Sequence, residues 1–152
     1  MILFSVVILS IMNASNPTLR DLASEIGNVL IRWCFLESAM RAQLQEAGMQ
    51  ERITKGPIIS HWRSHMRVRR AAQADHDVIA AHLDAVEKVA ASRNLLAHCI
   101  HSAFADPWEA DSAVVVCKAA DGKEHELTIE MIRRLSEEID WVRRLIDGHV
   151  RL

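Results

Sequence analysis

The chain has 152 residues, of which 50% are hydrophobic and 25% charged, and its formal net charge is -2. A chain of this length buries one good core, which favours a single domain. Because the charge balance is slightly acidic, nucleic-acid binding through bulk charge is excluded, and any such contact needs a local basic patch. Five glycines, three prolines and few aromatic residues favour helices over a sandwich or barrel.

The cysteines indicate the redox environment. Cys34, Cys99 and Cys117 form no CxxC pair, and an odd number of cysteines cannot pair fully within one chain. We therefore expect reduced thiols and a cytoplasmic protein.

Residues 1–15 form a separate N-terminal segment that begins with the apolar run MILFSVVILSIM. The run is too short to span a bilayer as a helix. No positive charge precedes it, as one would in a secretory signal, although Ala14-Ser15 fits a cleavage site. We expect no membrane contact. The segment either packs on the core or on a dimer, or reflects a start codon placed too early.

The apolar spacing predicts a first long helix that ends at Gly48. Asn16 can cap it, with Pro17 at the first helical position. Apolar residues recur along it at Leu19, Leu22, Ile26, Leu30, Trp33, Leu36, Met40 and Leu44. Glu37 lies within this stripe, where a lone carboxylate would be costly.

Two further helices follow Gly56-Pro57. The first covers IISHWRSHMRVRR, residues 58–70, and the second runs from about residue 75 to residue 103. Arg93 falls in the middle of the apolar face of the second. Because the two long helices carry opposite charges on their buried stripes, we predict an ion pair between Arg93 and Glu37.

The segment AVVVCKAADGKEHEL predicts two short strands around Asp121-Gly122, a hairpin turn signal. Thr128 can then cap a last helix that ends at Gly148. The expected fold class is all-α: an antiparallel helical bundle over residues 16–148, with a small β-hairpin inserted before the last helix.

The stretch SRNLLAHC, residues 92–99, places polar groups in a helix that otherwise looks buried. Asn94, His98 and His101 would share one helix face, which Glu87 continues toward the N-terminus. Arg93 and His98 are five residues apart, about 140° around the axis. Three interpretations compete: a structural ion pair with a hydrogen-bonded histidine, a metal site, or chemistry on a phosphate.

The metal interpretation rests on His61-x3-His65 and His98-x2-His101, spacings that can present two imidazoles to one ion. Neither pair has an acidic or thiolate neighbour at a persuasive spacing, so we predict no metal site.

Residues 52–70 carry six positive charges and no acidic residue. The set is either a solvated basic helix face or an RNA-binding surface. The candidates for RNA binding are Arg63, Arg67, Arg69 and Arg70, with Arg52 and Lys55 ahead of them.

The six residues from Arg93 to His98, RNLLAH, resemble the R-x4-H signature of the HEPN superfamily (higher eukaryote and prokaryote nucleotide-binding domains), with its polar residue directly after the arginine. The motif's place late in a long helix, the Trp33-x3-Glu37 pattern in an early helix and a last helix after a short hairpin are similar to bacterial members. Cys99 stands where many relatives have glycine, a position that does not react in the family.

The resemblance implies a metal-independent, cofactor-free endoribonuclease that acts as a homodimer on RNA. By position, His98 would be the acid/base group, Arg93 would stabilise phosphate charge and Asn94 would orient groups in the site, with Glu37 and His101 in support. The 2′-hydroxyl of RNA is the nucleophile, so proton transfer and anion stabilisation are the main needs. The family also suggests a toxin with an antitoxin protein as partner, or a phage-defence component. The alternative is a non-catalytic HEPN-like module that binds a nucleotide or a protein.

Overall fold

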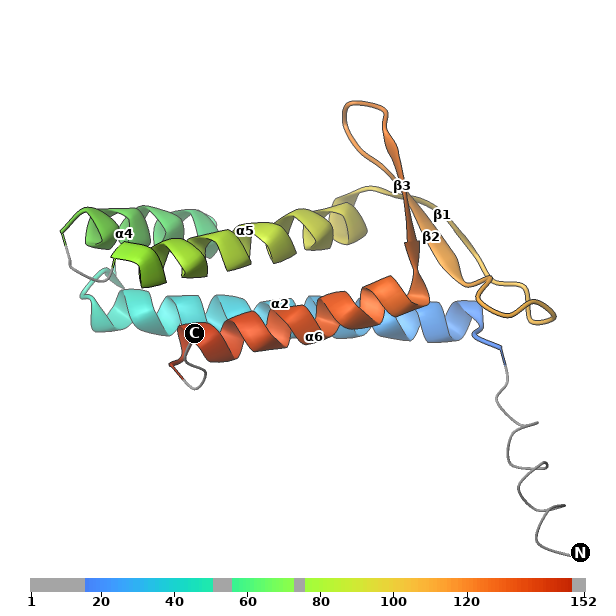
Figure 1. Ribbon diagram of the computed structural model, residues 1–152, viewed down its shortest axis with the longest axis horizontal. Helices are drawn as coiled ribbons and strands as arrows, with labels where there is room; N and C mark the ends of the chain where they lie inside the picture. The colour runs from blue at the N-terminus through green and yellow to red at the C-terminus, as the bar shows by residue number, and fades with distance from the viewer. Residues whose placement is uncertain (1–15, 51–55, 73–75, 149–152) are drawn as a thin grey trace, which may run out of the picture.

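The computed structural model describes residues 16–50, 56–72 and 76–148 (Figure 1). In these ranges the helices are α2 (Leu19–Glu46), α4 (Ile58–Ala72), α5 (His76–His98) and α6 (Ile129–Ile146), and the strands are β1 (Ile100–Phe104), β2 (Val114–Lys118) and β3 (Glu124–Thr128). The predicted N-terminal segment 1–15, together with Arg52 and Lys55, lies outside the described residues.

The helices pack side by side and the sheet lies at one end of the bundle (Figure 1). α5 runs toward the sheet and α6 runs away from it, so these two helices are antiparallel. α2 and α6 run in the same direction, because Arg133 pairs with Glu25 and, further along both helices, Asp140 pairs with Arg32. The mostly helical architecture was predicted, but the bundle is not antiparallel throughout.

A single hydrophobic core joins all four described helices and β2. Trp62 from α4, Val86 from α5 and Ile139 from α6 are fully buried. The predicted apolar stripe of α6 is buried along its length, at Ile129, Ile132, Leu135, Ile139, Val142 and Ile146. The period of the apolar residues therefore predicted which face of this helix meets the core.

The start of α2 differs from the prediction. Thr18, not Asn16, is the N-cap: its Oγ1 accepts a hydrogen bond from Asp21 N at 3.2 Å, and its backbone N–H donates to Asp21 Oδ2 at 2.8 Å. This reciprocal capping box satisfies two helix-end donors, which a lone asparagine cannot do. The Asn16 amide instead donates to Pro107 O at 3.0 Å and ties the start of α2 to the β1–β2 loop.

The sheet has three antiparallel strands in the order β1-β2-β3. The predicted hairpin corresponds to β2 and β3, with Gly122 at φ +83° in its turn. β1 was missed, because residues 99–103 were expected to continue the third helix. Instead Lys118 N donates to Cys99 O at 2.8 Å and Ile100 pairs with Cys117. Pairing with the β-branched run of β2 overrides the helical spacing of this segment.

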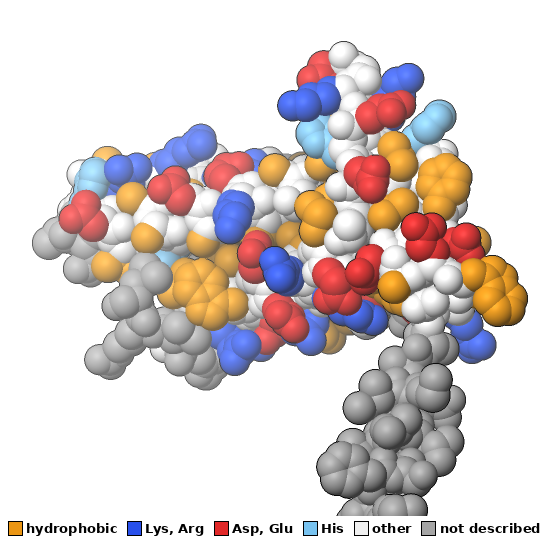
Figure 2. All heavy atoms as spheres, turned by 45° about the vertical axis from the view of Figure 1, so that its right-hand side comes forward, with side chains coloured by type: hydrophobic (Ala, Val, Ile, Leu, Met, Phe, Trp, Pro, Cys, Tyr) orange, Lys and Arg blue, Asp and Glu red, His pale blue; other side chains and the backbone are white. Residues whose placement is uncertain are grey.

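The two faces of the sheet differ in burial. Val115 and Cys117 of β2 are fully buried against the core. Phe104 at the end of β1 is 57% exposed, and Trp108 in the following loop is 92% exposed. Figure 2, in which the sheet end comes forward, shows apolar and acidic side chains side by side there. One covered and one solvated face is common in antiparallel sheets.

Candidate functional site

The R-x4-H residues lie in the last turns of α5, and His98 is the final helical residue. Arg93 is half-buried, whereas Asn94 and His98 are exposed. Because Asn94 and His98 are four residues apart in a regular helix, they share one face, as predicted.

Arg93 is fixed by two contacts. Its Cζ lies 5.0 Å from the centroid of the Trp33 ring, a cation–π distance. Its Nη1 donates to Asn94 Oδ1 at 3.1 Å. The Nε atom is buried and makes no hydrogen bond within the described part of the chain. Most of the five guanidinium N–H donors are therefore not used by protein acceptors among these residues.

The predicted ion pair between Arg93 and Glu37 is wrong. Glu37 Oε1 accepts a hydrogen bond from Trp33 Nε1 at 2.8 Å, and no ion pair joins the carboxylate to Arg93 in the ranges that the structure covers. Trp33 and Glu37 are one helical turn apart, which brings the indole N–H to the carboxylate. The same ring presents its face to Arg93. Trp33 therefore contacts both charged groups, a role that the sequence analysis missed.

His101 does not lie on the motif's helix face, because α5 ends at His98 and His101 is an exposed residue of β1. The His98 imidazole makes no hydrogen bond or ion pair with another described residue. The structure thus joins Arg93 to Asn94 and leaves the His98 imidazole open to solvent one turn further on.

The arginines of α4 fall into two groups. Arg63 is paired with Glu87 of α5: Nη2 donates to Oε2 at 2.8 Å, and Nε lies 2.7 Å from Oε1. Within the described ranges, no carboxylate pairs with the remaining three, Arg67, Arg69 and Arg70. Arg63 is therefore a structural link between two helices, and the other three provide the open basic face.

The basic face and the motif lie at opposite ends of α5. Arg70 Nε is 3.1 Å from His76 Nε2 at the start of α5, whereas His98 is its last residue. At about 1.5 Å per residue, the two ends of the helix are roughly 33 Å apart. A ligand that touches both must extend along the molecule.

Residues 16–50, 56–72 and 76–148 contain neither a metal-binding cluster nor a membrane-spanning helix. No three His, Cys, Asp or Glu side chains come close enough together there to hold a metal ion. No helix in those ranges combines the length and apolar character needed to cross a membrane.

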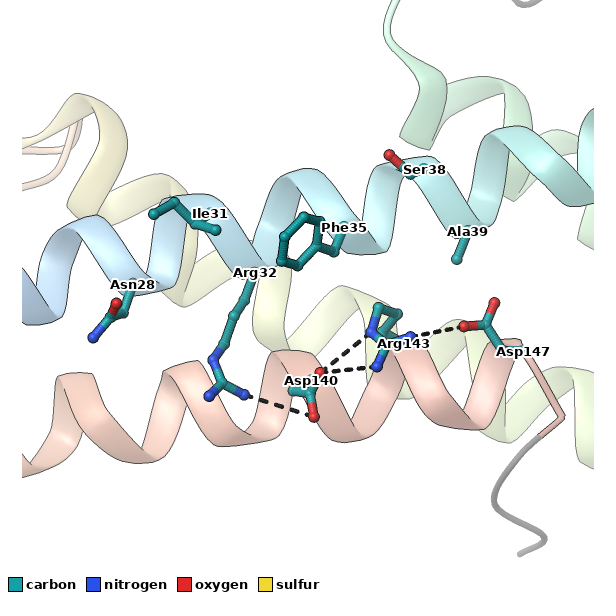
Figure 3. Close-up of a pocket in the computed structure, with 9 residues that line it drawn as sticks. All are labelled: Asn28, Ile31, Arg32, Phe35, Ser38, Ala39, Asp140, Arg143 and Asp147. Atoms are coloured by element: carbon teal, nitrogen blue, oxygen red, sulfur yellow. Dashed lines mark hydrogen bonds and ion pairs between the residues drawn. The ribbon is translucent and has the colours of Figure 1, made fainter.

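A groove of about 670 Å³ lies between α2 and α6 (Figure 3). Ile31 and Phe35 border it and are 55% and 56% exposed. Neither residue was among the predicted site residues, although both lie outside the buried stripe of α2. The groove is lined by Asn28, Ile31, Arg32, Phe35, Ser38, Ala39, Asp140, Arg143 and Asp147.

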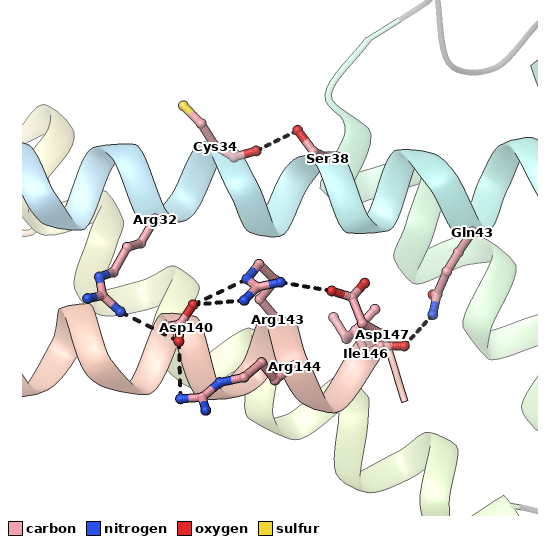
Figure 4. Close-up of polar contacts among 9 residues, drawn as sticks. All are labelled: Arg32, Cys34, Ser38, Gln43, Asp140, Arg143, Arg144, Ile146 and Asp147. Carbon is pink, nitrogen blue, oxygen red and sulfur yellow. Dashed lines mark hydrogen bonds and ion pairs between the residues drawn. The ribbon is translucent and has the colours of Figure 1, made fainter. Parts of the chain in front are cut away.

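The charged residues of the groove bind one another (Figure 4). Asp140 Oδ1 accepts from Arg143 Nε at 3.2 Å and from Nη2 at 3.1 Å, and its Oδ2 lies 3.1 Å from Arg144 Nη2. Arg32 Nη1 approaches Oδ2 at 3.6 Å, and Arg143 Nη1 donates to Asp147 Oδ2 at 3.0 Å. This network connects α2 to α6 and makes the groove chiefly a structural feature.

Comparison of the chain with models of known protein families, with curated proteins and with solved structures found no match. The function must therefore be argued from the site. Chemically, Arg93, Asn94 and His98 offer a fixed guanidinium with unused donors and, one turn away, an imidazole that solvent can reach.

Proposed function

We propose that the protein is a metal-independent, cytoplasmic endoribonuclease of the HEPN type. It would cleave RNA by attack of a 2′-hydroxyl on the adjacent phosphate, leaving a 2′,3′-cyclic phosphate and a 5′-hydroxyl. The observation that carries the proposal is the exposed His98 one turn beyond Arg93, whose guanidinium rests on Trp33 and binds Asn94.

The chemistry needs two kinds of group, and the site has both. An imidazole exchanges protons near neutral pH, so His98 can take the proton of the 2′-hydroxyl or give one to the leaving 5′-oxygen. A guanidinium stays charged and can donate to two phosphate oxygens at once, which suits the charge that develops at phosphorus. No metal is needed, because RNA supplies the nucleophile.

Trp33, Glu37 and Asn94 would be positioning residues. The ring of Trp33 holds the guanidinium from one side and Asn94 Oδ1 holds it at its edge. Glu37 orients the indole through its 2.8 Å hydrogen bond. Such support matters because catalytic groups act only when held close to their productive geometry.

The proposal also names partners. RNA would contact the open basic face of α4. The homodimer, the antitoxin partner and the phage-defence role are proposed from the family resemblance alone. A second candidate function is a non-catalytic nucleotide- or protein-binding module. Its support is that, among the described residues, the His98 imidazole makes no hydrogen bond with the side chain of Arg93 or Asn94.

The test is cleavage of a mixed RNA substrate in EDTA by wild type and by His98→Ala. We expect wild type to release fragments with 2′,3′-cyclic phosphate ends, and the variant to be slower by about 10² or more. His125→Ala, which removes a histidine from β3, is the control and should cleave like wild type. Equal cleavage by His98→Ala would remove His98 from the chemistry. A folded wild type that cleaves none of a varied set of RNAs would favour the binding module.

A further inference from the structure

Cys99 lies at the junction between α5 and β1, where the helix meets the sheet (Figure 1). Its backbone N–H donates to Leu95 O at 3.0 Å and continues the hydrogen bonding of α5, while its carbonyl accepts from Lys118 N at 2.8 Å. The side chain is half-buried and packs against the hydrophobic core. The backbone thus fixes Cys99 from both sides of the junction, and its thiol is only partly covered.

A second cysteine contacts the same core from β2. Cys117 is fully buried, and its backbone pairs with Ile100, the residue after Cys99. The two cysteines are therefore diagonal neighbours across the strand pair, which puts their Cα atoms roughly 6 Å apart. A disulfide needs Cα atoms about 4.4 to 6.8 Å apart. Because Cys99 precedes β1, the side-chain alternation of that strand does not turn its thiol away from the core.

The two thiols differ in reactivity. Burial raises the pKa of the Cys117 thiol above its ordinary value of 9.0, and the nearby Cys99 raises this pKa further. The second effect depends on the two sulfur atoms being close, since two thiolates repel each other. The thiolate is the reacting form, so Cys117 is slow toward an outside reagent. Cys99, which solvent reaches, is the thiol that such a reagent meets first.

The backbone beside the pair leaves room for a small movement. The register of β1 shifts between Ile100 and Ser102, next to Cys99. An irregularity of this kind loosens the hydrogen-bonded ladder locally. Cys99 can therefore move toward Cys117 without disturbing the rest of the strand pair.

We propose that Cys99 and Cys117 form a redox modification site, at which a peroxide converts the two thiols into a disulfide. The Cys99 sulfur attacks one oxygen of hydrogen peroxide and becomes a sulfenic acid. The O–O bond breaks, and the leaving hydroxide takes the Cys99 proton and departs as water. The Cys117 sulfur then attacks the sulfenic sulfur, the S–O bond breaks, and the hydroxyl leaves with the Cys117 proton as a second water. Two thiols are oxidised and one peroxide is reduced.

The disulfide ties the end of α5 to the buried strand β2. His98, the residue before Cys99, is the last residue of α5, so oxidation restricts the helix end that carries the imidazole. The modification site does not depend on the proposed function, because its chemistry uses only the two thiols. Transient disulfides of this kind are the usual form in cytosolic proteins.

The first experiment detects the bond by mass spectrometry. A Cys34→Ser background removes the exposed third thiol. The folded protein is treated with hydrogen peroxide and digested without reductant. We expect one cross-linked peptide pair that contains Cys99 and Cys117, with the loss of two hydrogen atoms per chain. Dithiothreitol should return both thiols to an alkylating reagent.

Single-cysteine variants in the same background test the order of the two steps. Cys117→Ala keeps the buried position apolar and should stop at a sulfenic acid on Cys99, which dimedone traps. Cys99→Ser should leave the Cys117 thiol at least about 10-fold less reactive toward peroxide than Cys99 is in Cys117→Ala. Circular dichroism of both variants checks that they fold.

Two results would overturn the proposal. One is over-oxidation of Cys99 to a sulfinic acid while Cys117 in the same folded chain stays a thiol, which would make Cys117 a small apolar core residue only. The other is a bond between the two cysteines that appears only in urea concentrations that unfold the protein. Hydrogen exchange of the linked form gives a further check, since the amides of β1 should become more protected than in the reduced protein.

Discussion

Trp33 lets the protein hold two opposite charges near each other without pairing them directly. The residue is 2% exposed, and it donates from Nε1 to Glu37 while its ring face receives Arg93. A direct buried ion pair would lose the solvation of both charged groups, and its Coulomb energy often fails to compensate. Here each charge keeps one good contact with the indole, and the guanidinium keeps free donors. That is what a phosphate-binding arginine requires.

Trp33→Phe tests this arrangement. Phenylalanine keeps a ring near Arg93 but removes the indole N–H, so the half-buried Glu37 carboxylate loses its donor, and the smaller side chain also leaves space in the core. We expect the free energy of unfolding to fall by about 1 to 3 kcal/mol, as measured by urea denaturation. Trp141→Phe, at an exposed tryptophan of α6 with no such bond, should change stability by less than about 0.5 kcal/mol. Equal effects of the two variants would contradict the role given to the indole.

The stability of the folded protein should depend on pH through His82, a residue of α5 that faces α4. Burial lowers the pKa of this α5 histidine below its ordinary value of 6.5, and the nearby Arg69 of α4 lowers it further. In the unfolded chain the imidazole binds a proton more readily than in the folded protein. Stability should therefore be independent of this group well above pH 6.5 and should fall as the pH drops below 6.5 toward the folded pKa.

His82→Gln removes the titrating group. The free energy of unfolding of this variant, measured by urea denaturation between pH 7.5 and pH 5, should fall less than that of wild type. His76→Gln is the control at an exposed histidine of the same helix and should keep the wild-type slope. Parallel slopes for all three proteins would show that His82 is not the source of the pH dependence.

The sequence predicted elements well where the local pattern and the tertiary contacts agree. α6 has a capping threonine, a one-sided apolar stripe and a terminal glycine, and its predicted and observed bounds coincide closely. α5 was predicted too long because residues 99–103 continue its helical spacing, and only the pairing of β1 with β2 shows that they are not helical. A single-sequence pattern contains no information on such a long-range pairing.

The side-chain contacts of the candidate site could also be predicted only in part, because some of them join residues far apart in the sequence. Arg93, Asn94 and His98 were placed correctly on one helix, since that needs only the helical period. The contact of Arg93 with Trp33 rather than Glu37 depends on how α2 and α5 cross, which the period of each helix does not give.

Charge is distributed unevenly over the whole molecule despite a net charge of only -2. The open arginines lie on α4, toward the end of the bundle away from the sheet (Figure 1). The sheet end is acidic, with Asp106, Glu109, Asp111, Glu124 and Glu126 exposed. A polyanion should therefore approach at α4, and to reach His98 it must run along α5.

Replacing the three open arginines, Arg67, Arg69 and Arg70, by glutamine tests this path. Because each phosphate contact releases counterions, the slope of log K against log salt for single-stranded RNA should become shallower by about 2. The three residues are remote from His98, so KM should rise while kcat changes little. Arg134→Gln, at an exposed arginine of α6, is the control and should leave the slope nearly unchanged. An unchanged slope in the triple variant would mean that RNA does not follow α4, and the basic face would then be a solvated helix surface.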